Sequence, residues 1–230
     1  MKPLTVAIIG PDGAGKTTVA QRIRTGLPRP VRYIYMGVNA EASNVALPTT
    51  RWLNRFHRAR GAPPAGGPPD PGRRARPKGW KARMKSDLRS MISLTNRLAE
   101  EWFRQLVTWY QLGRGRIVLY DRHFYTDYYA HDIVANGRER SLGQRIHGFM
   151  LQHVYPKPDL VILLDAPAEV LWARKPEGTF AAVAQRRQEY LDMGREFADF
   201  AIVDATQSPD LVYQQVEQLI LERSDGPRGR

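Results

Sequence analysis

The sequence predicts an α/β fold in which helices cover both faces of a five-stranded parallel sheet. Five short apolar runs have the length and composition of buried strands, and segments with helical spacing follow them. A glycine-rich turn separates the first strand from the first helix. Strands that alternate with helices are joined by parallel crossovers, so this order predicts a three-layer α/β/α domain. The predicted strands are 4–9, 31–36, 116–121, 160–165 and 201–204.

The predicted helices differ in length and in their end signals. The longest apolar stripe covers 81–112, as one helix or two in sequence, and Gly113 is its expected stop. Ser141 is expected to cap the helix that follows the third strand. The remaining helices are predicted at 17–25, 167–175, 180–199 and 209–223.

Length and composition exclude several classes of protein. The chain has 230 residues, which predicts a single domain over 1–230. It contains no cysteine, so a disulfide framework, a thiolate metal site and a cysteine nucleophile are excluded. Its apolar runs are shorter than the ~20 residues of a membrane-spanning helix. The N-terminal apolar run is also too short for a secretory signal. We therefore expect a soluble, cytoplasmic protein.

The positive charge is concentrated in one segment. Residues 51–89 contain twelve basic and two acidic residues, a net charge of +10 against +12 for the whole chain. Within this segment, 61–72 is rich in proline and glycine, so a flexible insertion is expected at about 37–80. Such a segment attracts anions, but a solvated loop that maintains solubility explains the charge equally well.

The turn after the first strand matches the phosphate-loop pattern Gly-x-x-x-x-Gly-Lys-Thr over residues 10–17. Its glycines allow backbone amides to face phosphate oxygens, and the start of the next helix adds its positive dipole end. Lys16 is expected to reach the β- and γ-phosphates of ATP, and Thr17 to hold Mg²⁺. The nucleotide-binding residues that this pattern predicts are Gly10, Gly13, Ala14, Gly15, Lys16 and Thr17.

A second element, Asp121-Arg122-His123, stands at the end of the third strand. Ligands of open α/β sheets bind at the carboxyl ends of the strands. There, Asp121 could approach Mg²⁺ or accept a proton from the acceptor, and Arg122 could bind a second phosphate. A structural ion pair is the alternative interpretation.

A third element is a basic segment after the fourth strand, predicted as a lid at about 174–187. Phosphoryl transfer spreads negative charge over the moving group, which cations can stabilise. Ordinary surface arginines on a helix are the alternative. The basic residues concerned are Arg174, Lys175, Arg186 and Arg187.

In this order, the three elements resemble the thymidylate kinase family of P-loop nucleoside monophosphate kinases. The resemblance covers 4–25, about 97–130 and 158–220. It implies a P-loop kinase fold, ATP and Mg²⁺ as cofactors, and a phosphorylated small-molecule acceptor, with dTMP as the family default. It also allows a homodimer formed through helices.

The resemblance assigns roles to individual residues. It extends the phosphate loop to Asp12 and Thr18. It implies that Arg122 holds the acceptor phosphate and that Asp121 acts near the attacking phosphate and Mg²⁺. Arg174 resembles an arginine that packs on the adenine, and Ala205 lies in the turn beside it. The catalytic residues that it implies are Lys16, Asp121, Arg122 and Arg174.

The acceptor side departs from the family pattern. Arg97 and Glu101 fall near the positions where the family carries a Phe-x-x-x-Arg pair, and Gly13 stands where an arginine is frequent. The aromatic residues after Asp121-Arg122 either line a different acceptor pocket or pack in the core. The acceptor-binding residues are predicted to be Asp12, Arg97, Arg122, Phe124 and Tyr128.

Two further functions stay open. A kinase of the same fold could act on a sugar, a glycan or a lipid-linked phosphate that docks on the basic segment. Alternatively, a nucleotide-dependent protein could bind nucleic acid or an acidic membrane surface through 51–89. The second of these is not favoured, because only Trp52, Phe56 and Trp80 interleave with the charges.

Overall fold

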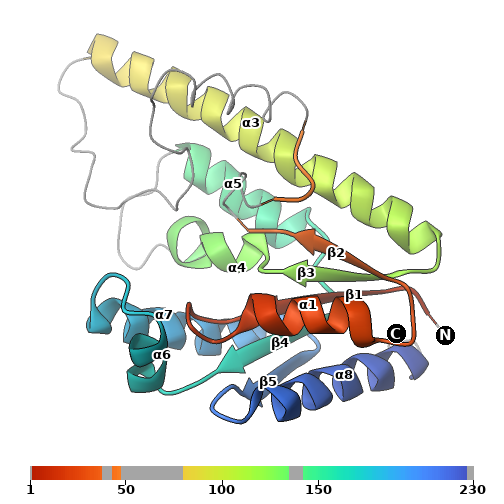
Figure 1. The fold of residues 1–230 in the computed structure, drawn as a ribbon. Coiled ribbons are helices and arrows are strands. Elements are labelled where there is room, and N and C mark those ends of the chain that lie inside the picture. Colours follow the sequence, from red (N-terminus) through yellow and green to blue (C-terminus); the bar gives the residue numbers. More distant parts are fainter. Residues whose placement is uncertain (1, 38–42, 48–79, 135–141, 227–230) are drawn as a thin grey trace, which may run out of the picture.

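The computed structural model describes residues 2–37, 43–47, 80–134 and 142–226 (Figure 1). Its centre is a parallel sheet whose strands lie in the order β2-β3-β1-β4-β5. The predicted five-stranded α/β fold is therefore confirmed. The strands are β1 (Leu4–Ile9), β2 (Val31–Tyr35), β3 (Ile117–Asp121), β4 (Leu160–Asp165) and β5 (Phe200–Asp204).

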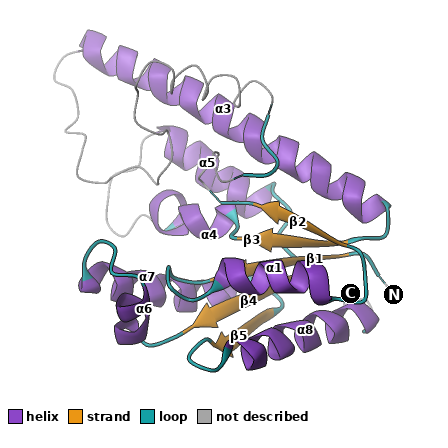
Figure 2. Cartoon of the chain, in the orientation of Figure 1, coloured by secondary structure: helices purple, strands orange, loops and turns teal. Residues whose placement is uncertain are grey.

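Helices pack on both faces of the sheet (Figure 2). The α-helices of the described segments are α1 (Lys16–Gly26), α3 (Trp80–Gly113), α4 (Phe124–Tyr128), α5 (Leu142–His153), α6 (Ala168–Arg174), α7 (Phe180–Met193) and α8 (Pro209–Asp225). A π-helical turn (Tyr129–Ile133) follows α4, and a 3₁₀ turn (Gly194–Glu196) follows α7. None of these helices is long and apolar enough to cross a bilayer.

Two hydrophobic cores give the molecule its three layers. On one face, alternate residues of β1 such as Val6 and Ile8 pack against α1, α6 and α8. On the other face, Ala7 and Ile9 pack against side chains of α3, α4, α5 and α7. Successive strand residues point to opposite faces, so the continuous apolar run of β1 is buried on both sides.

The structure differs from the predicted elements at two places. The helix predicted over 180–199 ends at Met193, and the chain turns so that Phe197 enters the core. Gly194 makes this turn possible, because a Cβ there would lie 2.8 Å from the ring of Phe200. The short helix α4 and its π turn were not predicted. Ser141 lies outside the described residues, so its capping role stays a prediction.

Candidate active site

The phosphate loop is a tight turn at the carboxyl end of β1. Gly13 adopts φ 87°, and a Cβ there would lie 2.8 Å from the carbonyl oxygen of Leu171 in α6. A side chain at this position would therefore be strained and would require the loop or α6 to shift. Gly15 precedes α1 without a side-chain cap, and the first turn of α1 carries no acidic residue. The amides at the start of α1 are thus suited to an anion.

Lys16 is buried under this loop. Its side chain is 5% exposed, and its Nζ donates to the carbonyl oxygen of Pro11 at 2.7 Å. Burial, aided by the charge of Arg122, lowers the pKa of Lys16 to about 8. The nearest carboxylate oxygen, Asp12 Oδ1, is 3.7 Å away. Because this ammonium group is so little solvated, a negatively charged ligand would stabilise its charged form.

Asp121 lies beside Thr17 at the end of β3. Its Oδ2 accepts hydrogen bonds from the Thr17 hydroxyl at 3.0 Å and from the Tyr33 hydroxyl at 2.8 Å. Its Oδ1 is buried without a hydrogen-bond partner in the described parts of the chain. Since buried carboxylate oxygens are normally hydrogen-bonded, the orphaned Oδ1 points to a missing cationic or polar ligand.

These donors fit Mg²⁺. Hydroxyl and carboxylate oxygens are hard ligands, and Mg²⁺ is usually held by one or two protein groups together with water and phosphate oxygens. No group of three or more His, Cys, Asp or Glu side chains forms a metal cage within the described ranges. Thr17 and Asp121 would therefore hold the ion together with the phosphates of a nucleotide.

Arg122 faces the phosphate loop from β3. Its backbone has φ 65°, which non-glycine residues rarely adopt, and its amide donates to the carbonyl oxygen of Ile8. Its Nη2 donates to Asp12 Oδ1 at 2.6 Å. Burial raises the pKa of Asp12, but the charges of Arg122 and Lys16 outweigh burial and lower it. The structure thus brings together Lys16, Asp12 and Arg122 beside the phosphate loop.

The segment around α6 and α7 supplies further predicted residues. Arg174 Nη1 donates to the carbonyl oxygen of Ala205 at 2.8 Å, so the two residues expected beside the adenine lie together. Arg187 instead forms two hydrogen bonds, of 2.8 and 2.7 Å, with the carboxylate of Asp165. Arg187 therefore joins α7 to β4.

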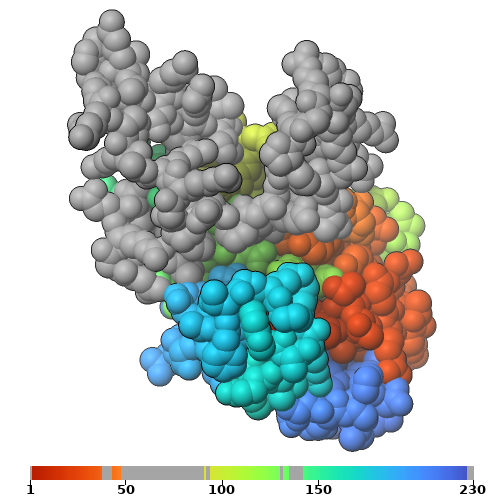
Figure 3. Space-filling model, turned by 60° about the vertical axis from the view of Figure 1, so that its left-hand side comes forward, coloured from red at the N-terminus to blue at the C-terminus, as the bar shows by residue number. Residues whose placement is uncertain are grey.

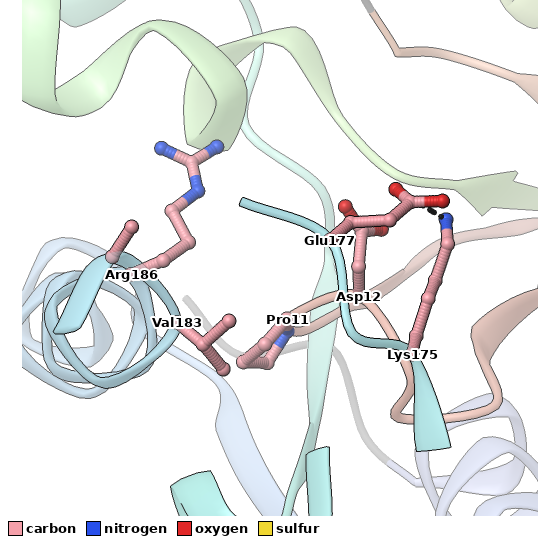
Figure 4. A pocket seen from close by; sticks show the side chains of 7 residues that line it. Pro11, Asp12, Lys175, Glu177, Val183 and Arg186 are labelled. Carbon is pink, nitrogen blue, oxygen red and sulfur yellow. Dashed lines mark ion pairs between the residues drawn. The ribbon is translucent and has the colours of Figure 1, made fainter. Parts of the chain in front are cut away.

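A pocket separates the phosphate loop from α7. Figure 3 shows α6 and α7 beside the N-terminal segment on the molecular surface. Lys175 pairs with Glu177 at 3.2 Å on one side of the pocket, and Arg186 projects from α7 on the other (Figure 4). Both cations are near the loop, whereas their closure over a nucleotide stays a prediction. The lining residues are Pro11, Asp12, Lys175, Glu177, Ala182, Val183 and Arg186.

The aromatic residues after Arg122 are buried in different surroundings: Phe124 packs in the core, and Tyr128 lies against Arg97. Phe124 is 1% exposed and packs edge-on against Tyr155, with ring centroids 5.1 Å apart. Tyr128 is also buried, and the guanidinium of Arg97 lies 4.5 Å above its ring. Of the two interpretations, core packing accounts for Phe124. Arg97 and Tyr128 lie together, as two members of the predicted acceptor side.

His123 caps α4 at the same end of β3. Its Nδ1 accepts a hydrogen bond from the backbone amide of Tyr125. Complete burial lowers the pKa of His123 to about 3, so the ring is neutral at physiological pH. His123 therefore positions α4 and carries no charge in the site.

A buried network lies behind Arg97. His147 in α5 contacts Asp132 Oδ2 through Nδ1 at 2.6 Å and Glu101 Oε1 through Nε2 at 3.0 Å. Arg97 Nη1 is 3.3 Å from the same oxygen of Asp132, and the edge of the Tyr128 ring faces the imidazole. Asp132 thus faces both Arg97 and His147, Glu101 faces His147, and these four side chains are together neutral only when His147 is protonated.

The network predicts a pH-dependent stability. Burial alone would lower the pKa of His147, but its hydrogen bonds to Asp132 and Glu101 raise it. A pKa raised by folding stabilises the protein below the unfolded value of about 6.5, and this contribution is lost as the pH rises through the folded value. We expect His147→Gln to destabilise the protein more at pH 6 than at pH 9, as measured by urea unfolding.

The control for this prediction is His153→Gln, because His153 is exposed on the same helix. Comparing each variant with the wild type at the same pH cancels the titration of all other groups. An equal loss of unfolding free energy at both pH values in His147→Gln would show that the imidazole does not carry the charge.

Arg104 and Tyr33 are site residues that the sequence did not indicate. Arg104 is 4% exposed, and its guanidinium donates to the carbonyl oxygens of Val45 and Gly37 at 3.1 and 2.9 Å. It thereby ties α3 to the segment that follows β2. The signal available in the sequence was Glu100, four residues earlier in an apolar helix stretch, since buried charges occur in pairs.

Comparisons with known proteins agree with this geometry. No protein-family model matches the chain. A probable thymidylate kinase 1 from Saccharolobus solfataricus is 35% identical over 77 residues, which are 31% of this chain; the chain spans only 40% of that relative's length. The structure of a deoxyadenosine kinase from M. mycoides with bound dATP matches with a TM-score of 0.52 and 16% identity, over 95% of this chain and 99% of the other.

One of these matches is a similarity of sequence, and the other is a similarity of fold. At 16% identity, the likeness to the solved structure establishes the fold alone. The partial match to the thymidylate kinase is an independent similarity at the level of sequence. Together they confirm the predicted resemblance to P-loop nucleoside monophosphate kinases and show that this chain has the three-layer P-loop kinase fold.

Proposed function

We propose that this protein is an ATP- and Mg²⁺-dependent phosphotransferase. The observation that carries the proposal is the convergence of Lys16, Thr17 and Asp121 at the uncapped start of α1. The names of the two related proteins, a thymidylate kinase and a deoxyadenosine kinase, support phosphoryl transfer to a nucleoside or its monophosphate.

The donor side follows from the phosphate loop. Backbone amides at the start of α1 would bind phosphate oxygens, and Lys16 would contact the group that is transferred. Mg²⁺ held by Thr17 and Asp121 would supply positive charge to the phosphates of ATP. Arg174, fixed by the carbonyl oxygen of Ala205, would lie against the adenine.

For the acceptor, we propose a nucleoside monophosphate, with dTMP as the first candidate. Arg122 is the group that would bind its phosphate, because the guanidinium lies beside the phosphate loop and is 29% exposed. Asp12 holds this guanidinium at 2.6 Å, in an orientation that an acceptor phosphate can use. Arg97 and Tyr128 would lie on the side of the acceptor's base or sugar.

Arg122→Gln should therefore impair acceptor use far more than donor use. The variant keeps a polar side chain but leaves the acceptor phosphate without a cation, so we expect KM for the monophosphate to rise by about tenfold or more, while KM for ATP changes little. Steady-state kinetics with each substrate varied in turn measures this difference. Arg22→Gln is the matched control, because Arg22 forms a surface ion pair with Asp210 away from the site.

A coupled assay of ADP release tests the proposed reaction itself. The panel contains dTMP, the other nucleoside monophosphates and the unphosphorylated deoxynucleosides, since one structural neighbour is a deoxyadenosine kinase. Turnover confined to monophosphates supports the proposal. Turnover of deoxynucleosides alone would show that the acceptor is an unphosphorylated nucleoside and not a nucleoside monophosphate. If calorimetry shows that the folded protein binds neither ATP–Mg²⁺ nor ADP–Mg²⁺, the proposal is wrong.

The other acceptors and partners stay predictions. Residues 51–79 and the side chains of 80–89 lie outside the described part of the structure, so no contact there supports docking of a glycan, lipid, nucleic acid or membrane surface. Deletion of 61–79 is the test, because it should impair use of such an acceptor and leave ATP affinity intact. The homodimer that the resemblance allows could use the apolar residues exposed on α3, namely Leu106, Trp109 and Tyr110.

A further inference from the structure

Tyr33 reaches the metal-binding end of the sheet from the edge strand β2. It pairs with Leu119 of β3, two residues before the pair formed by Tyr35 and Asp121. Successive pairs alternate between the faces of a sheet, so Tyr33 and Asp121 project on the same side, which α1 covers. The Tyr33 ring packs against the hydrophobic core on that side. Its hydroxyl therefore reaches Asp121 from a packed ring.

The two oxygens of Asp121 have different environments. Oδ2 accepts two hydrogen bonds, at 2.8 Å from the Tyr33 hydroxyl and at 3.0 Å from the Thr17 hydroxyl. Oδ1 accepts none within the described residues, although it is fully buried. With Oδ2 fixed by donors from two different elements, rotation of the carboxylate would break one or both bonds. The asymmetry therefore leaves Oδ1 as the oxygen available to a cation.

The Tyr33 hydroxyl acts as a hydrogen-bond donor to Asp121. Burial and the neighbouring Asp121 raise the pKa of Tyr33, so its proton stays in place at physiological pH. The Thr17 hydroxyl donates its one proton to Asp121 and keeps its lone pairs for a metal ion. With both hydrogen bonds made to Oδ2, Oδ1 of Asp121 and the lone pairs of the Thr17 hydroxyl stay available to a metal ion.

We propose that Tyr33 is a positioning residue of the metal site: its hydroxyl fixes Oδ2 of Asp121, so that Oδ1 stays turned toward the ion held beside Thr17. The inference rests on the proposed function, because the ion is the Mg²⁺ that accompanies the nucleotide. Residues that hydrogen-bond to a metal ligand typically contribute a factor of about 10–100 to metal affinity.

Tyr33→Phe is a direct test, because it removes the hydroxyl and keeps the ring. Calorimetric titration of ADP with and without Mg²⁺, together with electron paramagnetic resonance of Mn²⁺ in the presence of ADP, separates metal binding from nucleotide binding. We expect the variant to bind Mn²⁺ about tenfold more weakly, while its affinity for metal-free ADP equals that of the wild type. A merely structural role would change both affinities or neither.

Tyr120→Phe is the matched control. Tyr120 is the neighbour of Asp121 in β3, but its hydroxyl donates to Thr108 at 3.1 Å on the opposite face of the sheet. The Thr108 hydroxyl keeps a second partner, the carbonyl oxygen of Arg104. This variant thus loses one buried hydroxyl without touching the metal site, and its Mn²⁺ affinity should be that of the wild type.

The outcomes separate this inference from the proposed function. Wild-type Mn²⁺ affinity in Tyr33→Phe would overturn the role of Tyr33 and leave the phosphotransferase proposal intact. An equal loss in Tyr33→Phe and Tyr120→Phe would also overturn it, because the effect would then belong to the sheet. A wild-type protein that binds neither ATP–Mg²⁺ nor ADP–Mg²⁺ would contradict the proposed function itself.

Discussion

Lys16→Met is expected to lower kcat for phosphoryl transfer by about 10³-fold, because a positioned charge at a developing negative group contributes 10²–10³ or more. The side chain is buried, and its Nζ lies at the carbonyl oxygen of Pro11 inside the phosphate loop. Methionine has similar length and no charge. Since burial disfavours the ammonium form in the free protein, its removal should not cost stability.

The measurement is kcat with saturating ATP–Mg²⁺ and acceptor, together with the unfolding free energy in urea. Lys2→Met is the matched control, because Lys2 also donates to a single backbone carbonyl, that of Gly226, far from the phosphate loop. Both variants should remain folded, and only Lys16→Met should lose turnover. If Lys16→Met keeps kcat within about threefold of the wild type, the assignment of the loop to phosphate chemistry is wrong.

The parts of this protein that the sequence predicted well depend on local signals. Apolar runs marked all five strands to within one residue. The signal is clearest for β1, β3 and β4, which are buried on both faces and carry few polar residues, whereas the edge strands β2 and β5 are partly exposed. The phosphate loop was equally readable, since the pattern requires glycine where the backbone has positive φ, as at Gly10 and Gly15. Asp121 and Arg122 followed because parallel strands end at a common edge.

The parts that were missed depend on contacts between distant segments. Tyr33 and Asp121 are 88 residues apart, and Arg104 and Gly37 are 67 apart. In sequence, Tyr33 has the pattern of an ordinary β-strand tyrosine and Arg104 that of a surface helix residue. Only the docking of α3 and the register of β2 against β3 give them partners. Likewise, Phe124 could not be assigned to core or pocket before the packing of Tyr155 was known.

The second large effect is expected for Arg104→Met, which should lower the free energy of unfolding by about 3–5 kcal/mol. The guanidinium is almost fully buried and is the donor for the carbonyl oxygens of Gly37 and Val45. Its loss removes the Arg104 hydrogen bonds to both oxygens, of which Val45 keeps the donor Ser43 Oγ, and leaves Glu100 buried without its ion-pair partner at 3.7 Å. Among the described residues, the Leu47 amide still donates to the Glu100 carboxylate.

Urea unfolding of three variants separates charge from packing. Arg114→Met, in the exposed turn that follows α3, should cost less than about 0.5 kcal/mol. Arg104→Met combined with Glu100→Gln should recover part of the loss, because the remaining buried charge is then removed. A loss below about 1 kcal/mol in Arg104→Met alone would show that the guanidinium is not the buried anchor.

The same substitution should also affect the acceptor side. Gly37 lies at the end of the segment that Arg104 fixes, and a Cβ on Gly37 would be 2.9 Å from Cδ of Arg122. Loosening this segment removes a constraint on the guanidinium that would bind the acceptor phosphate. We therefore expect Arg104→Met to raise KM for the monophosphate, and to leave KM for ATP unchanged, at temperatures where the variant is folded. An equal rise in both KM values would mean that the damage extends to the phosphate loop, and that Arg104 supports the whole site and not its acceptor side alone.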